Sequence, residues 1–152
     1  MNKAETNSLL KDEYFQIERV ILDFDQRAIT IKAWSVTASM AGISASFLSD
    51  SYMLLLLASL SSIVFWTIEG FWKQFQSAHY KRCGDIEKYF AGKHDILIPL
   101  QIANSWIKTL KKGGNKRLWK IMCMPHVALP HILIADVGII ILNLALNGTI
   151  EI

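Results

Sequence analysis

Two mostly apolar stretches separated by only three residues constrain the fold of this chain more than any other feature. They cover residues 29–48 and 52–72, and Ser49-Asp50-Ser51 connects them. About 20 predominantly apolar residues in a helix cross the hydrocarbon core of a bilayer. Because a connection this short joins neighbouring antiparallel helices, the two stretches predict a transmembrane helical hairpin.

The overall composition favours a membrane protein. Apolar residues make up 52% of the 152 residues, and the mean hydropathy is +0.29. A soluble domain of this size has too much surface to hide so many apolar side chains, so a soluble helical bundle is the less favoured interpretation. The N-terminus is acidic and amphipathic and does not resemble a signal peptide. Insertion is therefore expected to depend on the internal spans.

Heptad patterns extend both arms of the hairpin. Residues 1–7 are polar and are expected to fray, whereas a continuous helix is predicted from about Ser8 to Leu48. The second helix is predicted to continue past its span to about Phe90. Each extension carries a narrow apolar seam, which predicts that the two extensions pair antiparallel as a stalk. On its seam, His79 is expected to be a buried, hydrogen-bonded histidine rather than a ligand or a catalytic base. The seams are Leu10, Tyr14, Ile17, Ile21, Phe24 and Ala28 in the first helix, and Ile68, Trp72, Phe75, His79, Cys83, Ile86 and Phe90 in the second.

Small residues recur on one face of the first span. Such a face lets another backbone approach closely, and its hydroxyl groups can bond across helices. The face either packs against the second span of the same chain, or it lies between subunits or against a pore. Lys32, near the inner end of this span, is expected to extend toward the lipid headgroups. The face consists of Ser35, Ser39, Gly42 and Ser46.

A third span is predicted at residues 127–146, with Pro130 early in it and Asp136 as its charged residue. A carboxylate near the middle of a bilayer is costly and normally faces protein or water. Asp136 is therefore protonated or paired with a polar group on another span, or it lines a hydrated pathway or an oligomer axis. Asn143 and Asn147 follow on the same helix face. One such stripe cannot enclose a pore, whereas several copies around an axis can.

The segment between the second and third spans is basic. Residues 96–110 predict a short amphipathic helix at the membrane surface, with Leu100 on its apolar face, and Gly113-Gly114 predicts a turn after it. Lysine and arginine gather on the cytoplasmic side of membranes, which places this segment and the N-terminus in the cytoplasm. The basic cluster contacts lipid headgroups, a phosphate-bearing ligand or nucleic acid. Headgroups are favoured, and sequence-specific binding of nucleic acid is not expected. The cluster is Lys111, Lys112, Lys116, Arg117 and Lys120.

Enzymatic activity is not expected. The sequence has no glycine-rich phosphate loop, His-Glu-x-x-His motif, nucleophile elbow or CxxC pair. Cys83 and Cys123 lack a metal-ligand spacing, and His126 and His131 are a weak metal signal because Pro130 interrupts them. We therefore predict no catalytic residue, no metal and no cofactor.

The layout of residues 10–91 resembles the SLATT-type two-transmembrane effector domains of bacterial antiviral systems. The resemblance rests on the amphipathic helix, the short-turn hairpin and the pattern that follows the second span, Phe-Trp-Lys-Gln-Phe-Gln-Ser-Ala-His-Tyr-Lys-Arg-Cys-Gly-Asp-Ile-Glu-Lys-Tyr-Phe. It implies an effector that forms homo-oligomers and permeabilises or depolarises the bacterial inner membrane when a nucleotide signal or a cytoplasmic sensor protein activates it. The predicted third span departs from this two-span pattern.

The sequence thus predicts an all-α membrane protein in three parts. Residues 1–91 form the transmembrane hairpin and its cytoplasmic stalk, residues 92–124 a basic cytoplasmic or interfacial segment with a short helix, and residues 125–152 a C-terminal transmembrane helix. The leading functional hypothesis is a homo-oligomeric channel or pore-forming effector of antiviral defence. The alternative is a non-catalytic membrane subunit that anchors or assembles with a cytoplasmic partner.

Overall fold

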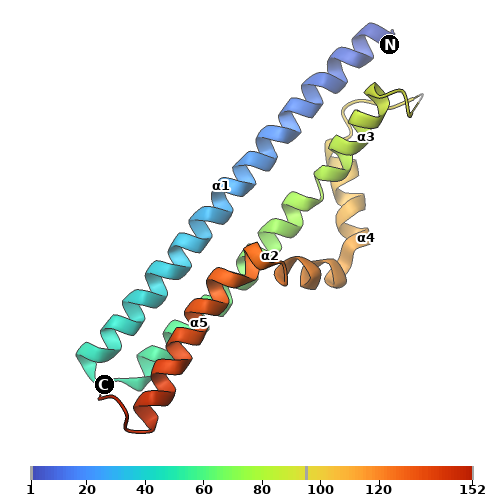
Figure 1. Ribbon diagram of the computed structural model, residues 1–152. Coiled ribbons are helices and arrows are strands. Elements are labelled where there is room, and N and C mark those ends of the chain that lie inside the picture. Colours follow the sequence, from blue (N-terminus) through green and yellow to red (C-terminus); the bar gives the residue numbers. More distant parts are fainter. Residues whose placement is uncertain (1, 95, 152) are drawn as a thin grey trace. The chain divides into compact units, whose positions relative to one another are not determined.

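A computed structural model describes residues 2–94 and 96–151 of the chain. Within these ranges the secondary structure is helical and contains no strand, which confirms the predicted all-α class. The helices are α1 (Lys3–Ser49), α2 (Tyr52–Ser77), α3 (Tyr80–Phe90), α4 (Ile102–Met122) and α5 (Pro125–Leu146) (Figure 1).

The first helix starts earlier than predicted because a side chain caps it. Asn2 Oδ1 accepts a hydrogen bond from the Glu5 amide at 2.8 Å, and the Thr6 hydroxyl donates to the Asn2 carbonyl at 3.0 Å. A side-chain acceptor of this kind satisfies an amide that a helix N-terminus leaves without an intrahelical partner. The prediction of fraying is therefore wrong for residues 3–7. The predicted continuous helix is confirmed, since α1 runs unbroken to Ser49.

The helix predicted to continue past the second span is interrupted at Ala78 and His79. The Ser77 hydroxyl donates to the Gln74 carbonyl at 2.8 Å, which is the acceptor that the Ala78 amide would normally use. The Ala78 amide bonds to the Phe75 carbonyl instead, at 3.3 Å. Competition by serine hydroxyls and bonds to the third preceding residue both loosen an α-helix. The break therefore arises without any proline or glycine.

The described residues form two compact units that both draw on α1. The first unit combines the residues up to Arg27 with Trp72–Leu118, and the second combines Ala28–Phe71 with the residues from Trp119 onward. Each unit has its own core.

The core of the first unit joins α1 to α3. Leu10 and Ile17 of α1 are fully buried and cluster with Cys83 and Ile86 of α3. All four residues lie on the seams predicted from the heptad steps. Burial of apolar side chains along such a seam is the main stabilising contribution of a helix pair.

A buried ion pair closes the same unit and shapes the chain after α3. Arg82 donates to both carboxylate oxygens of Glu13, at 2.8 and 2.9 Å. Glu13 also accepts hydrogen bonds from the Leu100 and Gln101 amides, at 2.8 and 3.3 Å. These bonds hold Leu100 at a φ of 61° and leave its side chain exposed. The prediction that a helix begins at residue 96 and includes Leu100 is therefore wrong, because α4 begins only at Ile102.

The paired glycines produce the predicted turn inside α4. Gly114 has φ 52° and ψ −161°, so α4 consists of two helical pieces that meet there. Glycine adopts this conformation without the steric cost of a Cβ atom.

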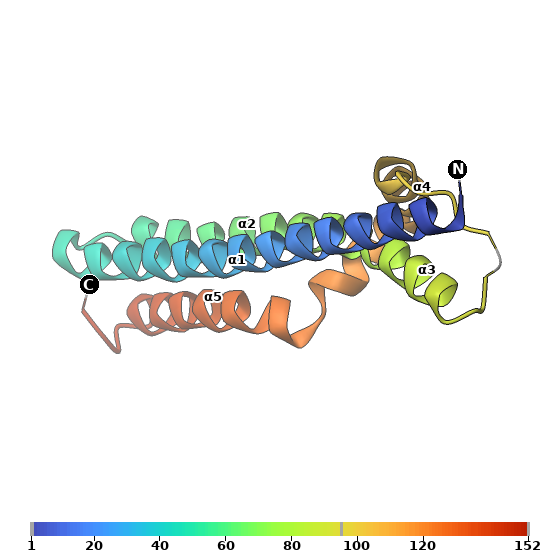
Figure 2. The same ribbon diagram turned by 90° about the horizontal axis from the view of Figure 1, so that it is seen from above.

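In the second unit, α1, α2 and α5 pack side by side (Figures 1 and 2). Ile43 of α1 clusters with Leu55 and Ala58 of α2, and side chains of α5 pack against this cluster. Contact between α2 and α5 depends on Gly138, where an added Cβ would lie 2.3 Å from Ser59 Oγ. Small residues at such positions let apolar helices approach closely.

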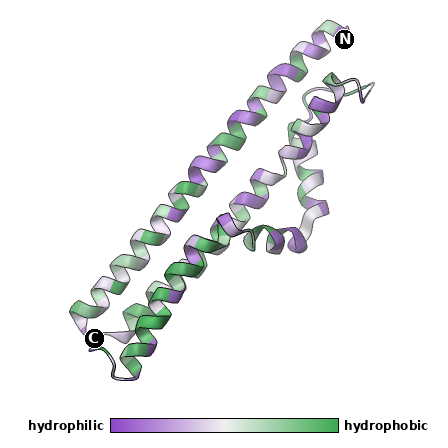
Figure 3. Ribbon diagram, in the orientation of Figure 1, coloured by the Kyte–Doolittle hydropathy of each residue, from purple (hydrophilic) through white to green (hydrophobic). Residues whose placement is uncertain are grey.

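Two helical stretches of the described residues are long and apolar enough to cross a membrane. They are Tyr52–Phe90, which takes in α2, the interruption at Ala78 and His79, and α3, and Pro125–Leu146. Figure 3 shows the corresponding apolar colouring along α5 and the first part of α2. Residues 29–48 are not among these stretches. Lys32 and the serine, threonine and glycine residues of this segment lower its hydropathy. A span there stays a prediction.

Candidate functional site

The predicted polar stripe of α5 lies on an exposed face of the second unit. Asp136, Asn143 and Asn147 are all exposed, whereas Ala135 and Gly138 face the neighbouring helices. The Asn147 side-chain amide donates to Asn143 Oδ1 at 2.8 Å, which places these two side chains on one face. Within residues 2–94 and 96–151, no hydrogen bond or ion pair engages the Asp136 side chain. Pairing of Asp136 with another span of the same chain is therefore not observed.

Apolar side chains surround this carboxylate on the exposed face. Leu133, Val137 and Ile140 are exposed by 58%, 46% and 57%, respectively. A carboxylate in such a setting is unfavourable against hydrocarbon and favourable only against water or another polar surface.

The predicted small-residue face of α1 is used within the chain. Ser35, Ser39 and Ser46 are fully buried, and Gly42 approaches Ala58 of α2 so closely that an added Cβ would lie 3.0 Å from the Ala58 Cβ. The Ser39 hydroxyl donates to the Ala58 carbonyl at 3.0 Å. The sequence left two alternatives open for this face, packing within the chain or contact with another subunit or a pore. The contacts with α2 correspond to packing within the chain.

A buried charged network joins the helices of the second unit. Glu69 of α2 has no exposed surface, and His131 of α5 is 1% exposed. Lys32 Nζ lies 2.5 Å from Glu69 Oε1, and His131 Nε2 lies 2.9 Å from Glu69 Oε2. The lysine side chain, 25% exposed, is the network's contact with the surface. Charged groups this deeply buried are retained in a folded protein only when they are paired.

Serine hydroxyls complete the network around the imidazole ring. His131 Nδ1 lies 2.8 Å from Ser35 Oγ of α1. Ser35 Oγ lies 3.4 Å from Ser62 Oγ of α2, and the Ser62 hydroxyl donates to the His131 carbonyl at 2.8 Å. Every polar side-chain atom of this histidine therefore has a partner, and the ring contacts two other helices.

This network was missed by reasoning from the sequence. Lys32 was expected to extend to lipid headgroups, but it binds Glu69 instead. One usable signal was present, because Lys32 lies 18 residues before Asp50 in the turn and Glu69 lies 19 residues after it. Antiparallel helices joined at that turn bring the two charges opposite each other. No comparable local signal identified His131.

The predicted basic cluster is divided by its contacts. Lys111, Lys112 and Lys116 are exposed in the first unit, and Lys120 is exposed in the second. Arg117 is half-buried and donates to the Ser77 carbonyl at 2.7 Å. Arg117 is therefore engaged in a bond within the protein, whereas headgroup or ligand binding was expected to be its role.

His79 is placed among aromatic rings but lacks the expected hydrogen bond. Its ring lies 6.0 Å from the rings of both Phe24 and Trp106. Its Nδ1 atom is buried and has no hydrogen-bond partner in the described part of the chain. Burial lowers the pKa of His79 because it disfavours the charged imidazolium. The expectation of a hydrogen-bonded histidine is wrong at this nitrogen.

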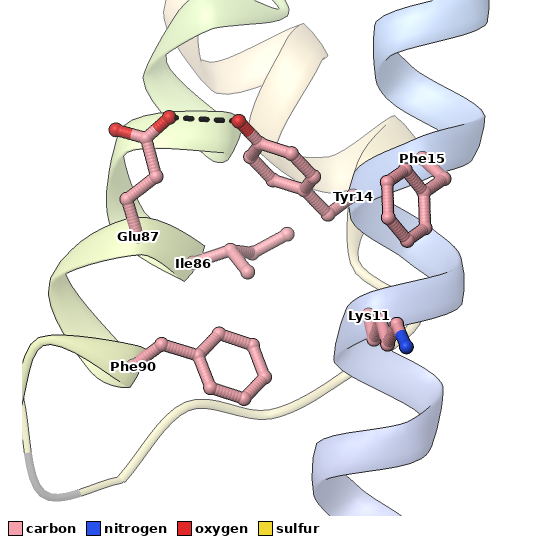
Figure 4. A pocket seen from close by; sticks show the side chains of 6 residues that line it. All are labelled: Lys11, Tyr14, Phe15, Ile86, Glu87 and Phe90. Carbon is pink, nitrogen blue, oxygen red and sulfur yellow. Dashed lines mark hydrogen bonds between the residues drawn. The ribbon is translucent and has the colours of Figure 1, made fainter.

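A groove of about 420 Å³ lies between α1 and α3 in the first unit (Figure 4). Phe15 and Phe90 line it and are 47% and 51% exposed. The Tyr14 hydroxyl donates to Glu87 Oε1 at 3.0 Å across the groove. This bond to the carboxylate raises the pKa of Tyr14 to about 12. The groove is thus an apolar surface with a polar edge.

Among the described residues, no group of three or more His, Cys, Asp or Glu side chains is arranged to hold a metal ion. In comparisons with protein-family models, curated proteins and solved structures, nothing matches this chain.

Proposed function

We propose that this chain is a small multi-pass membrane protein that assembles with copies of itself and permeabilises or depolarises the bacterial inner membrane. In this proposal residues 29–48 and 52–72 form a transmembrane hairpin, α5 is a further span, and the N-terminus lies in the cytoplasm. The apolar stretches of α2 and α5 support the membrane location.

The exposed carboxylate of Asp136 is the observation that carries the proposal. Because its neighbours on the surface of α5 are apolar, a monomer in a bilayer would expose this group to hydrocarbon. Translocon scales put the cost of an aspartate at a helix centre at roughly 3 kcal/mol. Assembly of several copies would turn the stripe toward water or toward another stripe, and would thereby remove this cost. A ring of such stripes could line a hydrated path.

The resemblance to SLATT-type effectors suggests the setting, which is antiviral defence. In that setting a nucleotide signal or a sensor protein would control assembly or opening. The exposed side chains of Lys111, Lys112 and Lys116 are available to contact anionic headgroups or such a signal.

The test combines the mass of the purified protein with its effect on membranes. We expect a discrete assembly of four or more copies in mild detergent, after correction for bound detergent, because one stripe per chain cannot surround an axis in a monomer or dimer. Expression should depolarise cells, as measured with a potential-sensitive dye. Asp136→Asn and Asn143→Ala should reduce this effect.

Asp50→Asn is the matched control, since Asp50 is an exposed carboxylate in the turn between α1 and α2. It should leave depolarisation unchanged. A monomeric or dimeric mass, or depolarisation that survives the Asp136 and Asn143 substitutions, would refute the stripe as the path.

The groove in Figure 4 favours one alternative, a membrane subunit that anchors a cytoplasmic partner through the first unit. Exposed Phe15 and Phe90 could receive an apolar side chain of such a partner. This alternative predicts that expression of the chain alone is harmless. It also predicts that Phe15→Ala abolishes co-purification with one specific neighbour while leaving membrane potential unaffected.

A further inference from the structure

We propose that copies of this chain bind one another through their first units, with a lysine-bearing face of α4 in one copy seated in an acidic hollow between α1 and α3 of the next copy. The inference rests on the self-assembly proposed above and names a surface through which it occurs. Both the hollow and the lysine-bearing face belong to the first unit of their own copy.

The acidic hollow has a volume of about 420 Å³ and shares Tyr14 and Glu87 with the groove in Figure 4. The carboxylates of Glu18 and Glu87 line it, together with the exposed side chains of Leu22 and Tyr80. Among the described residues that line it, none is a lysine, an arginine or a histidine. The hollow therefore suits an apolar side chain with a positive charge beside it.

The negative charge of the hollow acts on the groups that line it. Burial raises the pKa of the Cys83 thiol to about 11, and the charges of Glu87 and Glu18 contribute to this rise. The same two charges attract a cation and repel an anion. An anionic lipid headgroup is therefore an unsuitable occupant of the hollow.

The first helical piece of α4, before Gly114, carries the complementary face. Ile107, Lys108 and Lys111 are exposed there, and they lie on one side of the helix because residues three and four apart are neighbours. We call these three residues the lysine face. Residues 96–118 contain no Asp or Glu, so no carboxylate close in sequence offsets the charge of this face.

Within one copy the two surfaces do not neutralise each other. The ion pairs of the described chain include neither carboxylate of the hollow and neither lysine of the face. A surface whose complement lies elsewhere on the same chain makes a heterologous contact, which leads from copy to copy and forms a ring where the rotation closes. A second copy is thus an occupant that matches the hollow in both charge and apolar character.

Packing and charge have separate roles in this contact. Exposed ion pairs contribute little affinity, so the affinity comes from burial of Ile107 against Leu22 and Tyr80 of the next copy. The opposite charges around this apolar centre fix the orientation of the two copies and disfavour other pairings.

Cysteine cross-linking of the purified full chain in mild detergent tests which surfaces meet. In a Cys123→Ser background, which leaves only the buried Cys83, Leu22→Cys places a thiol at the hollow and Ile107→Cys places one on the lysine face. After oxidation, the chain with both substitutions should form a ladder of dimers, trimers and larger species on a denaturing gel, because each copy links to two neighbours. Each single variant should remain mostly monomeric.

Asp23→Cys combined with Ile107→Cys is the matched control, because Asp23 is exposed next to Leu22 in sequence but does not line the hollow. Its ladder should be several-fold weaker. An equally strong ladder in this control would overturn the proposal. Assembly of four or more copies without a ladder would overturn this contact alone, whereas a monomeric wild type would refute the proposed self-assembly as well.

Charge reversal tests the chemistry of the contact. Glu18→Lys with Glu87→Lys in the hollow, or Lys108→Glu with Lys111→Glu on the lysine face, should weaken the ladder several-fold. All four substitutions in one chain should recover it, since every contact then has exchanged charges. An unchanged ladder after either reversal, or no recovery in the combined variant, would overturn the proposal. So would the absence of a ladder together with binding to anionic vesicles that the lysine-face reversal abolishes, because that face would then belong to headgroups.

Discussion

Replacement of Gly138 by alanine tests the close approach of α5 to α2. An added Cβ would lie 2.3 Å from Ser59 Oγ, whereas carbon and oxygen atoms without a bond between them normally stay more than 3 Å apart. The Ser59 hydroxyl would have to rotate away and would lose its bond to the Leu55 carbonyl, which measures 3.0 Å. Overpacking costs about 1–3 kcal/mol and a lost hydrogen bond about 1 kcal/mol. The gain in helix propensity from glycine to alanine, at most about 1 kcal/mol, offsets part of this loss.

We therefore expect Gly138→Ala to destabilise the protein by about 1–3 kcal/mol in detergent, measured by thermal unfolding with circular dichroism. Gly84→Ala is the matched control, because a Cβ at Gly84 in α3 would meet no atom within 4 Å. That variant should be stabilised by a few tenths to about 1 kcal/mol, from helix propensity alone. Adding Ser59→Ala to Gly138→Ala should recover part of the lost stability. Equal stabilisation by Gly138→Ala and Gly84→Ala would show that α5 does not pack on α2 as described.

Three further predictions concern the first unit, one of them by comparison with Cys123 of the second. Glu13→Gln leaves the buried guanidinium of Arg82 without its counter-charge and should destabilise the unit by about 3–5 kcal/mol in thermal unfolding; an unchanged melting temperature would contradict a buried pair. Burial raises the pKa of the Cys83 thiol to about 11, whereas Cys123 is exposed, so a maleimide at about pH 8 should modify Cys123 first. Equal rates at the two thiols, determined by mass spectrometry, would be inconsistent with the core around Cys83. The Glu87 carboxylate raises the pKa of Tyr14 to about 12. The tyrosine therefore keeps its proton and its bond to Glu87 below about pH 10, and it loses both as the pH rises through 12. Ultraviolet absorbance should show one tyrosine ionising well after the others, and simultaneous ionisation of all tyrosines would contradict the bond.

Patterns that repeat along one helix were the most predictable part of the structure. Leu10 and Ile17 could be assigned to a buried seam because heptad steps specify which side of a helix meets a partner. Asp136 and Asn143 were expected to share a helix face for the same reason, since residues seven apart lie on one side of a helix. Both are exposed, and their place along a hydrated path stays a prediction. Neither assignment required knowledge of the rest of the fold.

Features that depend on individual side-chain contacts were less predictable. The break at Ala78 arises from a serine hydroxyl that competes for one carbonyl, and serine occurs in many unbroken helices. The partner of Lys32 could have been found by counting from the turn, because both charges lie in the same antiparallel pair. His131 could not, since its contacts require α5 to pack against both other helices in one register.

The division of the chain has a consequence for how the protein is made. The second unit contains residues 28–71, which lie in sequence between the two halves of the first unit. The bond between Glu13 and Arg82 therefore closes a loop of 69 residues, and closing such a loop costs chain entropy that grows with its length. Ordering of the intervening helices shortens the effective loop and raises the local concentration of one half around the other. During synthesis, the residues up to Arg27 cannot pack against residues 72–118 until the apolar helices between them have been made. A substitution confined to those helices should consequently slow the folding of the first unit without altering any of its contacts.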